Sequence, residues 1–282
     1  MIPAMFRFCT LGLLLISAFI LAIGCQFNRS FAPISPGHLF SNEQSRQGIV
    51  ALEHGNLSDA ERLLENAVKW NKNDINHRQR YAEVLWQQGK YQESLQQLNE
   101  AVKLRDGHDN ASLHISLAEK LLEIQEFTRA KHHANAAVRL NPQDHRSWAL
   151  RGKAKYRLAT QRAGFNENTL AMLHEARDDY LRAVSLAPND SALLVELAAV
   201  QMSCGQPEQA LATWLTIQNL YSQGSEPHEV LIGKTETLAM LQRFDEAEAT
   251  LATIRQRGLA TPEIERRLQE TMMLARGGGV RR

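Results

Sequence analysis

The chain has 282 residues, 44% of them hydrophobic, and carries 32 basic against 31 acidic residues. This balance argues against nucleic acid as a partner, because nucleic acid binding normally requires a strongly basic face. The three cysteines offer no disulfide framework, since two of them lie in the first 25 residues and Cys204 is alone in the rest. The length suits one extended domain behind a short leader.

The first 24 residues predict an export signal. Residues 11–24 carry no charge and are mostly Leu, Ile, Ala and Phe, which is typical of a secretory signal and short for a membrane-spanning helix. The segment LAIGC at 21–25 resembles the lipobox of bacterial lipoproteins, although Ala22 stands where Leu is commonest. The resemblance implies cleavage before Cys25 and acylation of its thiol. The alternative is an uncleaved signal anchor in which Cys25 is incidental, and both place the rest of the chain outside the cytoplasmic membrane.

Residues 25–42 predict a tether between the anchor and the folded domain, because they contain two prolines and no long apolar run. An anchor of two or more acyl chains holds stably, since each buried methylene contributes about 0.8 kcal/mol. By resemblance to bacterial lipoproteins, Gln26 after the cysteine implies the periplasmic side of the outer membrane rather than the inner membrane.

A short motif recurs four times along the rest of the chain. Ala-Val, then Lys, Arg or Ser, then Leu or Trp, begins at Ala67, Ala101, Ala137 and Ala183, at offsets of 34, 36 and 46 residues. Small and apolar residues at helical spacing precede each copy, and in two units a glycine separates this helix from an earlier one. Each unit is therefore helix, turn, helix, and such units bury their apolar faces by stacking on their neighbours.

This framework resembles the tetratricopeptide repeat (TPR) family. The resemblance implies an all-α, right-handed superhelical solenoid of about six repeats with a C-terminal capping helix. The residues that carry it most clearly are Gly48, Gly55, Ala60, Leu64 and Ala67 in the first unit, Tyr81, Ala82, Gly89, Ser94, Leu98 and Ala101 in the second, and the closing Asn141-Pro142 and Ala187-Pro188 of the third and fourth.

The predicted solenoid covers residues 43–276. Its repeats occupy about 41–74, 75–108, 111–144, 145–190, 191–224 and 228–261, followed by the cap at 262–276 and a flexible tail at 277–282. The fourth unit is about a dozen residues longer than the others. We interpret the excess at 160–168 as a loop between its two helices, which either contacts a partner or is a neutral surface insertion.

The TPR resemblance implies that first-helix residues line an inner groove for an extended peptide or a helix of a protein partner. Trp, Tyr and Arg in such a groove suit this role, because they dominate interface energetics. The alternative is that these side chains are solvated or cover the neighbouring repeat. The candidate residues are Arg46, Arg80, Glu83, Trp86, Glu119, Arg146, Lys153, Tyr156 and Arg157, with Leu52, Leu122 and Met202 on the same face.

Other side chains are expected to be structural. Cys204 beside Gly205 is expected at a turn, because no Cys–His motif accompanies it. His132 and His133 are adjacent and cannot share a metal ion in the usual i, i+4 manner, and no metal, phosphate-loop or catalytic motif occurs. We expect no metal, no cofactor and no enzymatic activity. Three tryptophans fall on framework positions and are expected in the core: Trp70, Trp148 and Trp214.

The sequence therefore predicts a non-enzymatic, membrane-anchored TPR scaffold that binds a protein partner in the bacterial envelope. Ser45 and Ile49 stand where carboxylate-clamp TPR proteins hold Lys and Asn, which argues against recognition of chaperone tails. A lipobox followed by several TPRs is similar to the architecture of pilus-assembly pilotins and outer-membrane assembly lipoproteins. The alternative is an uncleaved single-pass inner-membrane protein that assists a secretion, polysaccharide-export or cytochrome-maturation machine.

Overall fold

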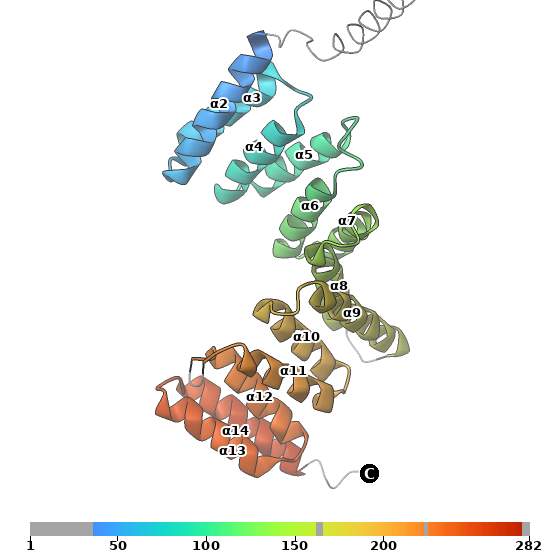
Figure 1. Ribbon diagram of the computed structural model, residues 1–282, viewed down its shortest axis with the longest axis vertical. Helices are drawn as coiled ribbons and strands as arrows, with labels where there is room; N and C mark the ends of the chain where they lie inside the picture. The colour runs from blue at the N-terminus through green and yellow to red at the C-terminus, as the bar shows by residue number, and fades with distance from the viewer. Residues whose placement is uncertain (1–35, 162–165, 223–224, 278–282) are drawn as a thin grey trace, which may run out of the picture. The chain divides into compact units, whose positions relative to one another are not determined.

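The computed structural model describes residues 36–161, 166–222 and 225–277, and every regular element in these ranges is a helix (Figure 1). The predicted signal peptide, Cys25 and most of the tether lie outside the described residues. None of the helices in the described ranges combines the length and the apolar composition that a membrane span requires. The helices are α2 (Pro36–Glu53), α3 (Leu57–Trp70), α4 (Ile75–Gln87), α5 (Tyr91–Val102), α6 (Ala111–Glu123), α7 (Phe127–Leu140), α8 (His145–Gln161), α9 (Glu167–Leu186), α10 (Ser191–Ser203), α11 (Pro207–Asn219), α12 (His228–Met240), α13 (Phe244–Gln256) and α14 (Pro262–Gly277).

The described helices follow one another as six helix–turn–helix pairs and a final helix, which confirms the predicted repeat number and cap. The chain divides into two compact units, residues 1–97 and 98–282, with the boundary inside α5.

In the N-terminal unit, α2 packs on α3 and α3 packs on α4. Ala60, Leu64 and Ala67 are fully buried at helical spacing on α3. Gly48 of α2 allows the close approach, because a Cβ there would come within 2.6 Å of the Leu64 side chain. The small-large pattern of the first repeat is therefore a packing requirement between its two helices.

In the C-terminal unit, α6–α7, α8–α9, α10–α11 and α12–α13 each pack as pairs, and successive pairs contact each other. Leu268 and Met272 of α14 are buried against a cluster that includes Leu238, Leu251 and Ile254. The last helix therefore covers apolar surface of the final pair, as a capping helix does.

The turn inside a repeat requires a residue in the left-handed conformation. Gly205 has a φ of +69° there, and Gly55 and Gly89 have similar values. In two other repeats, Gln125 and Gln242 occupy this conformation with φ of +63° and +59°. A side chain at this φ is strained, whereas glycine adopts it without steric cost. Cys204 is the C-cap residue of α10, directly before Gly205, which confirms the prediction that it lies at a turn.

Two predicted boundaries differ from the structure. α2 begins at Pro36, so residues 36–42 of the predicted tether are helical. The extra length of the fourth repeat lies mainly in longer helices, because α8 has 17 residues and α9 has 20, against 13 in α10 and α11. Asn166 caps α9 by accepting a hydrogen bond from the Thr169 backbone N–H at 2.9 Å. Residues 160–161 and 167–168 are therefore helix, and the interpretation of 160–168 as a loop is wrong at both ends.

The prediction of buried tryptophans holds for one of three. Trp214 is 5% exposed and donates its indole N–H to Thr237 Oγ1 at 3.1 Å. Trp148 is half-buried and donates to the Pro142 carbonyl at 2.9 Å. Trp70 is 61% exposed, because it ends α3 beyond the last buried position of that helix.

Candidate functional site on the first-helix face

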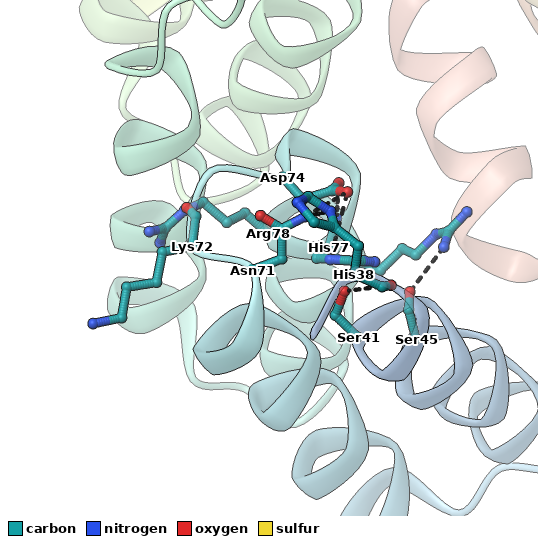
Figure 2. A network of polar contacts seen from close by, with 9 residues as sticks. His38, Ser41, Ser45, Asn71, Lys72, Asp74, His77 and Arg78 are labelled. Carbon is teal, nitrogen blue, oxygen red and sulfur yellow. Dashed lines mark hydrogen bonds and ion pairs between the residues drawn. The ribbon is translucent and has the colours of Figure 1, made fainter. Parts of the chain in front are cut away.

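The predicted groove residues of the N-terminal unit differ in their contacts, because Arg80 joins two helices whereas Arg46 and Glu83 bond within their own helices. Arg80 of α4 donates to Ser45 Oγ of α2 at 2.8 Å, a contact drawn with Ser45 in Figure 2. Arg46 pairs with Glu43 on its own helix at 2.7 Å. Glu83 accepts a hydrogen bond from Gln87 one turn later at 3.3 Å. In this unit, Arg80 therefore fits the alternative role of joining neighbouring repeats.

Trp86 is not an exposed groove residue. Its side chain is 9% exposed, and its ring lies 4.6 Å from that of Tyr91, between centroids. The indole is large enough to reach the first residue of α5 from α4, so it packs within its own repeat. The expectation of an exposed tryptophan at this place is wrong.

In the C-terminal unit, the first helices of the third and fourth repeats form a hollow of about 530 Å³. Glu119 of α6 and Lys153 and Arg157 of α8 line it, so three predicted residues meet there. The lining residues that the prediction did not include are Glu123, Gln125, Phe127, Leu150, Thr160 and Gln161, beside Leu122, which it did.

The hollow between α6 and α8 combines apolar and charged surface. Leu122 and Leu150 contribute half-buried apolar side chains. Glu119 and Arg157 contribute exposed charges of opposite sign, from the two different helices. Lys153 also reaches α10, where its Nζ lies 3.1 Å from Glu196 Oε1. Such a surface suits a polypeptide that carries both an apolar side chain and charges.

The two remaining predicted residues of α8 lie outside this hollow. Arg146 contacts Asp144 at the start of the helix, with Nη2 3.0 Å from Oδ2. Tyr156 is half-buried, and its hydroxyl lies 3.3 Å from Ser203 Oγ of α10. The side chain of Tyr156 therefore links two first helices, as the alternative interpretation allowed.

A second hollow, of about 520 Å³, continues the first-helix face over α10, α12 and α14. It includes Met202, which the sequence placed on this face, and it is more apolar than the first. The sequence offered a signal for Ala199. Glu119 and Lys153 each directly follow a small framework residue, and Ala199 likewise follows Ala198. Applying the same position to the fifth repeat would therefore have predicted Ala199 on this face. The lining residues are Ala199, Met202, Trp214, His228, Glu229, Ile232, Gly233, Glu236, Ile264 and Arg267.

Burial makes two of the described titratable side chains, Cys204 and His133, harder to ionise. Burial raises the pKa of the Cys204 thiol, which disfavours the nucleophilic thiolate. Burial, together with the neighbouring His114 and His132, lowers the pKa of His133 to about 4. His114 and His133 face each other through their Nδ1 atoms at 3.0 Å. Across the described ranges, no group of three or more His, Cys, Asp or Glu side chains could hold a metal ion.

Comparisons with known proteins support a TPR assignment. A family profile described as "Tetratricopeptide repeat" matches residues 51–108. The fold is similar to the solved structures of PilF from Pseudomonas aeruginosa (13% identity, TM-score 0.65, 84% of this chain and 100% of that one) and of PilW, a type IV pilus biogenesis factor (15%, 0.65, 81% and 98%). It is also similar to MamA from Desulfovibrio magneticus RS-1 (19%, 0.55, 67% and 97%). The comparison with curated proteins gave no match.

Proposed function

We propose that the chain is a non-enzymatic scaffold that holds a protein partner at a membrane in the bacterial envelope, and that the hollow between α6 and α8 is its main binding surface. The observation that carries this proposal is the meeting of Glu119, Lys153 and Arg157 around half-buried leucines in one hollow. These residues come from two repeats, so the surface exists only in the stacked fold. TPR architecture is suited to such binding, because it presents a long face instead of one enclosed pocket.

The partner segment best suited to this surface is an extended peptide or helix with an apolar anchor between charges of opposite sign. The apolar anchor would bury against Leu122 and Leu150, with an acidic group near Arg157 and a basic group near Glu119. Buried anchors supply most of the binding energy of such interfaces, whereas charges at the rim mainly set orientation and association rate. The similarity in fold to PilW, a type IV pilus biogenesis factor, supports envelope assembly as the context of this proposal.

Photocrosslinking in living cells tests the binding surface. A photoreactive amino acid at position 123 or 157, both exposed at the hollow, is expected to capture the same protein. The control is the exposed position 208 in the first turn of α11, which lies outside the hollow. Arg157→Glu is expected to abolish capture from position 123. Equal capture from position 208, or no capture from either hollow position, would refute the hollow as the binding surface.

Membrane attachment through Cys25 is a separate part of the proposal, supported by the lipobox-like segment alone. Incorporation of a labelled fatty acid that is lost in Cys25→Ala is the expected result. A chain that stays in the membrane without label would favour the uncleaved inner-membrane alternative. Separation of inner and outer membranes then decides between the two locations.

A further inference from the structure

The N-terminal unit has an exposed aromatic end where α2 begins and α3 finishes. Phe40 and Trp70 contact each other edge-on, with ring centroids 5.1 Å apart and planes at 64°. Phe40 remains 44% exposed, Trp70 61% and the neighbouring Leu39 59%. Three large apolar side chains gathered at the surface indicate an interaction site, whereas a single one does not. We refer to Leu39, Phe40 and Trp70 as the aromatic end.

A polar network fixes the backbone beneath the aromatic end (Figure 2). Asn71, directly after Trp70, donates from Nδ2 to His38 Nδ1 at 3.1 Å and so joins the end of α3 to the start of α2. Asp74 caps α4 by accepting from the His77 backbone N–H at 3.1 Å. Arg78 donates from Nε to the backbone carbonyl of Lys72 at 3.0 Å. The aromatic side chains are therefore displayed on a braced turn.

Cations accompany the aromatic end. Lys69 and Lys72 flank Trp70 and its neighbour Asn71, and both are exposed. Lys69 pairs with Glu65 at 2.8 Å, whereas Lys72 makes no ion pair within the described ranges, and its side chain points away from the network in Figure 2. Tryptophan and phenylalanine beside lysine are the combination found where proteins meet the headgroup region of a bilayer. The ring enters the interface, and the ammonium group remains with the phosphates.

The length of chain before α2 identifies what can cover this surface. Only ten residues lie between Cys25 and Pro36, so eleven Cα–Cα steps join them. A fully extended segment of that length spans at most about 40 Å. If Cys25 is anchored in a bilayer, the first turn of α2 stays within this distance of the lipid at all times, which gives the membrane a high effective concentration at the aromatic end.

We propose that the aromatic end rests on the membrane surface, with Trp70, Phe40 and Leu39 in the headgroup region and Lys72 on anionic lipid. This inference rests on the membrane anchor of the proposed function and is independent of the hollow between α6 and α8. It gives the anchored protein a second contact with lipid. A partner protein or a second copy at the same surface is the competing outcome.

Tryptophan quenching by lipid tests the contact directly. The full chain, extracted in detergent, is reconstituted into vesicles of phosphatidylethanolamine and phosphatidylglycerol that contain lipid brominated near the headgroup. We expect quenching of the tryptophan emission, and we expect Trp70→Phe to reduce the quenched fraction at least twofold. Trp148→Phe is the matched control, because Trp148 is a half-buried tryptophan of the other unit. Both variants keep an aromatic ring, and their circular dichroism melts are compared with the original chain.

Each result has one interpretation. If the original chain and Trp70→Phe both bind vesicles and are quenched to the same extent, the proposed contact is overturned and the anchor remains supported. If quenching is absent and Trp70→Phe changes the sedimentation of a dimer, the aromatic end binds a second copy of the chain. That result would also overturn the proposed lipid contact. Chain that fails to float with the vesicles would show that the anchor is wrong, and this inference would fall with it. The crosslinking at positions 123 and 157 reports on the hollow in every case.

Discussion

Removing the carboxylate of Asp179 is expected to destabilise the fourth repeat more than any change of a surface charge. Asp179 of α9 is 5% exposed and holds two cations of α8. Its oxygens lie 2.6 Å from Arg151 Nη2 and 2.9 Å from Lys155 Nζ, and Arg151 Nε donates to it at 3.0 Å. The cations are themselves 19% and 13% exposed. Asp179→Ala would leave both charges largely desolvated and without this carboxylate.

The magnitude follows from the burial of these groups. Removing one member of a buried ion pair costs about 3–5 kcal/mol, because the remaining charge is uncompensated. The lower end applies here, since the guanidinium keeps some contact with water and Lys155 also lies 3.1 Å from Glu175. We expect Asp179→Ala to cost about 3 kcal/mol. Asp179→Asn retains an acceptor without the charge, and we expect it to cost about 2 kcal/mol.

Urea unfolding followed by circular dichroism measures these differences. The matched control is Glu248→Ala, which breaks an equally short pair with Arg276 at 2.7 Å whose side chains are 57% and 54% exposed. Exposed pairs contribute little, so this change should cost about 0.5 kcal/mol. If Asp179→Ala and Glu248→Ala cost the same, the argument that burial makes the first pair costly to break would be refuted.

Three further predictions use the same unfolding measurement. Gln242→Gly relieves the strained φ of +59° at an exposed turn and should stabilise the protein by about 0.5 kcal/mol. Gly205→Ala introduces a side chain at a φ of +69° and should destabilise the protein by about 1 kcal/mol. If both variants changed the stability in the same direction, backbone strain would not be the cause. Gly233→Ala places a Cβ against the Trp214 ring and should cost about 1–3 kcal/mol. An unchanged midpoint would mean that the two helices separate freely. Burial holds the pKa of His133 at about 4, below about 6.5 in the unfolded chain, so the unfolded chain binds more protons in this window. The free energy of unfolding should therefore fall as the pH drops from about 6.5 to 4, and it should fall less in His133→Gln. An equally steep fall in that variant would assign the pH dependence of stability to other groups.

The repeat framework was predictable because it encodes contacts inside one repeat. Gly48 opposes Leu64 across a single turn, and Ala60 and Ala67 complete the same face, so their spacing alone identifies the packing. Trp70 shows where this reasoning stops. It fills the fourth place of the recurring motif, but that place ends the helix, and even Leu140 at the equivalent position is 37% exposed. Sequence periodicity identifies the buried face of a helix, but it does not show whether a neighbouring helix covers the last turn of that helix.

The sequence predicted which helix face carries the candidate site, but not which of its side chains meet. Glu119, Lys153 and Arg157 lie on the expected first-helix face, and the structure shows that they share one hollow. Their meeting depends on how α8 stacks on α6, which no local pattern specifies. Trp86 follows the same positional rule, yet its ring turns toward Tyr91 and is buried. Side-chain size and the adjacent helix decide such cases, and both require the folded structure.

The lengthened fourth repeat has a consequence for how such a protein diverges. Thr160 and Gln161, in the last turn of the extended α8, form one wall of the hollow between α6 and α8. Adding or deleting residues after Ala159 changes this wall of the hollow, while the buried residues of α8, from Ser147 to Ala159, all come before Thr160. Descendants of such a chain can therefore acquire a different partner through insertions and deletions at one helix end, with their stability little affected.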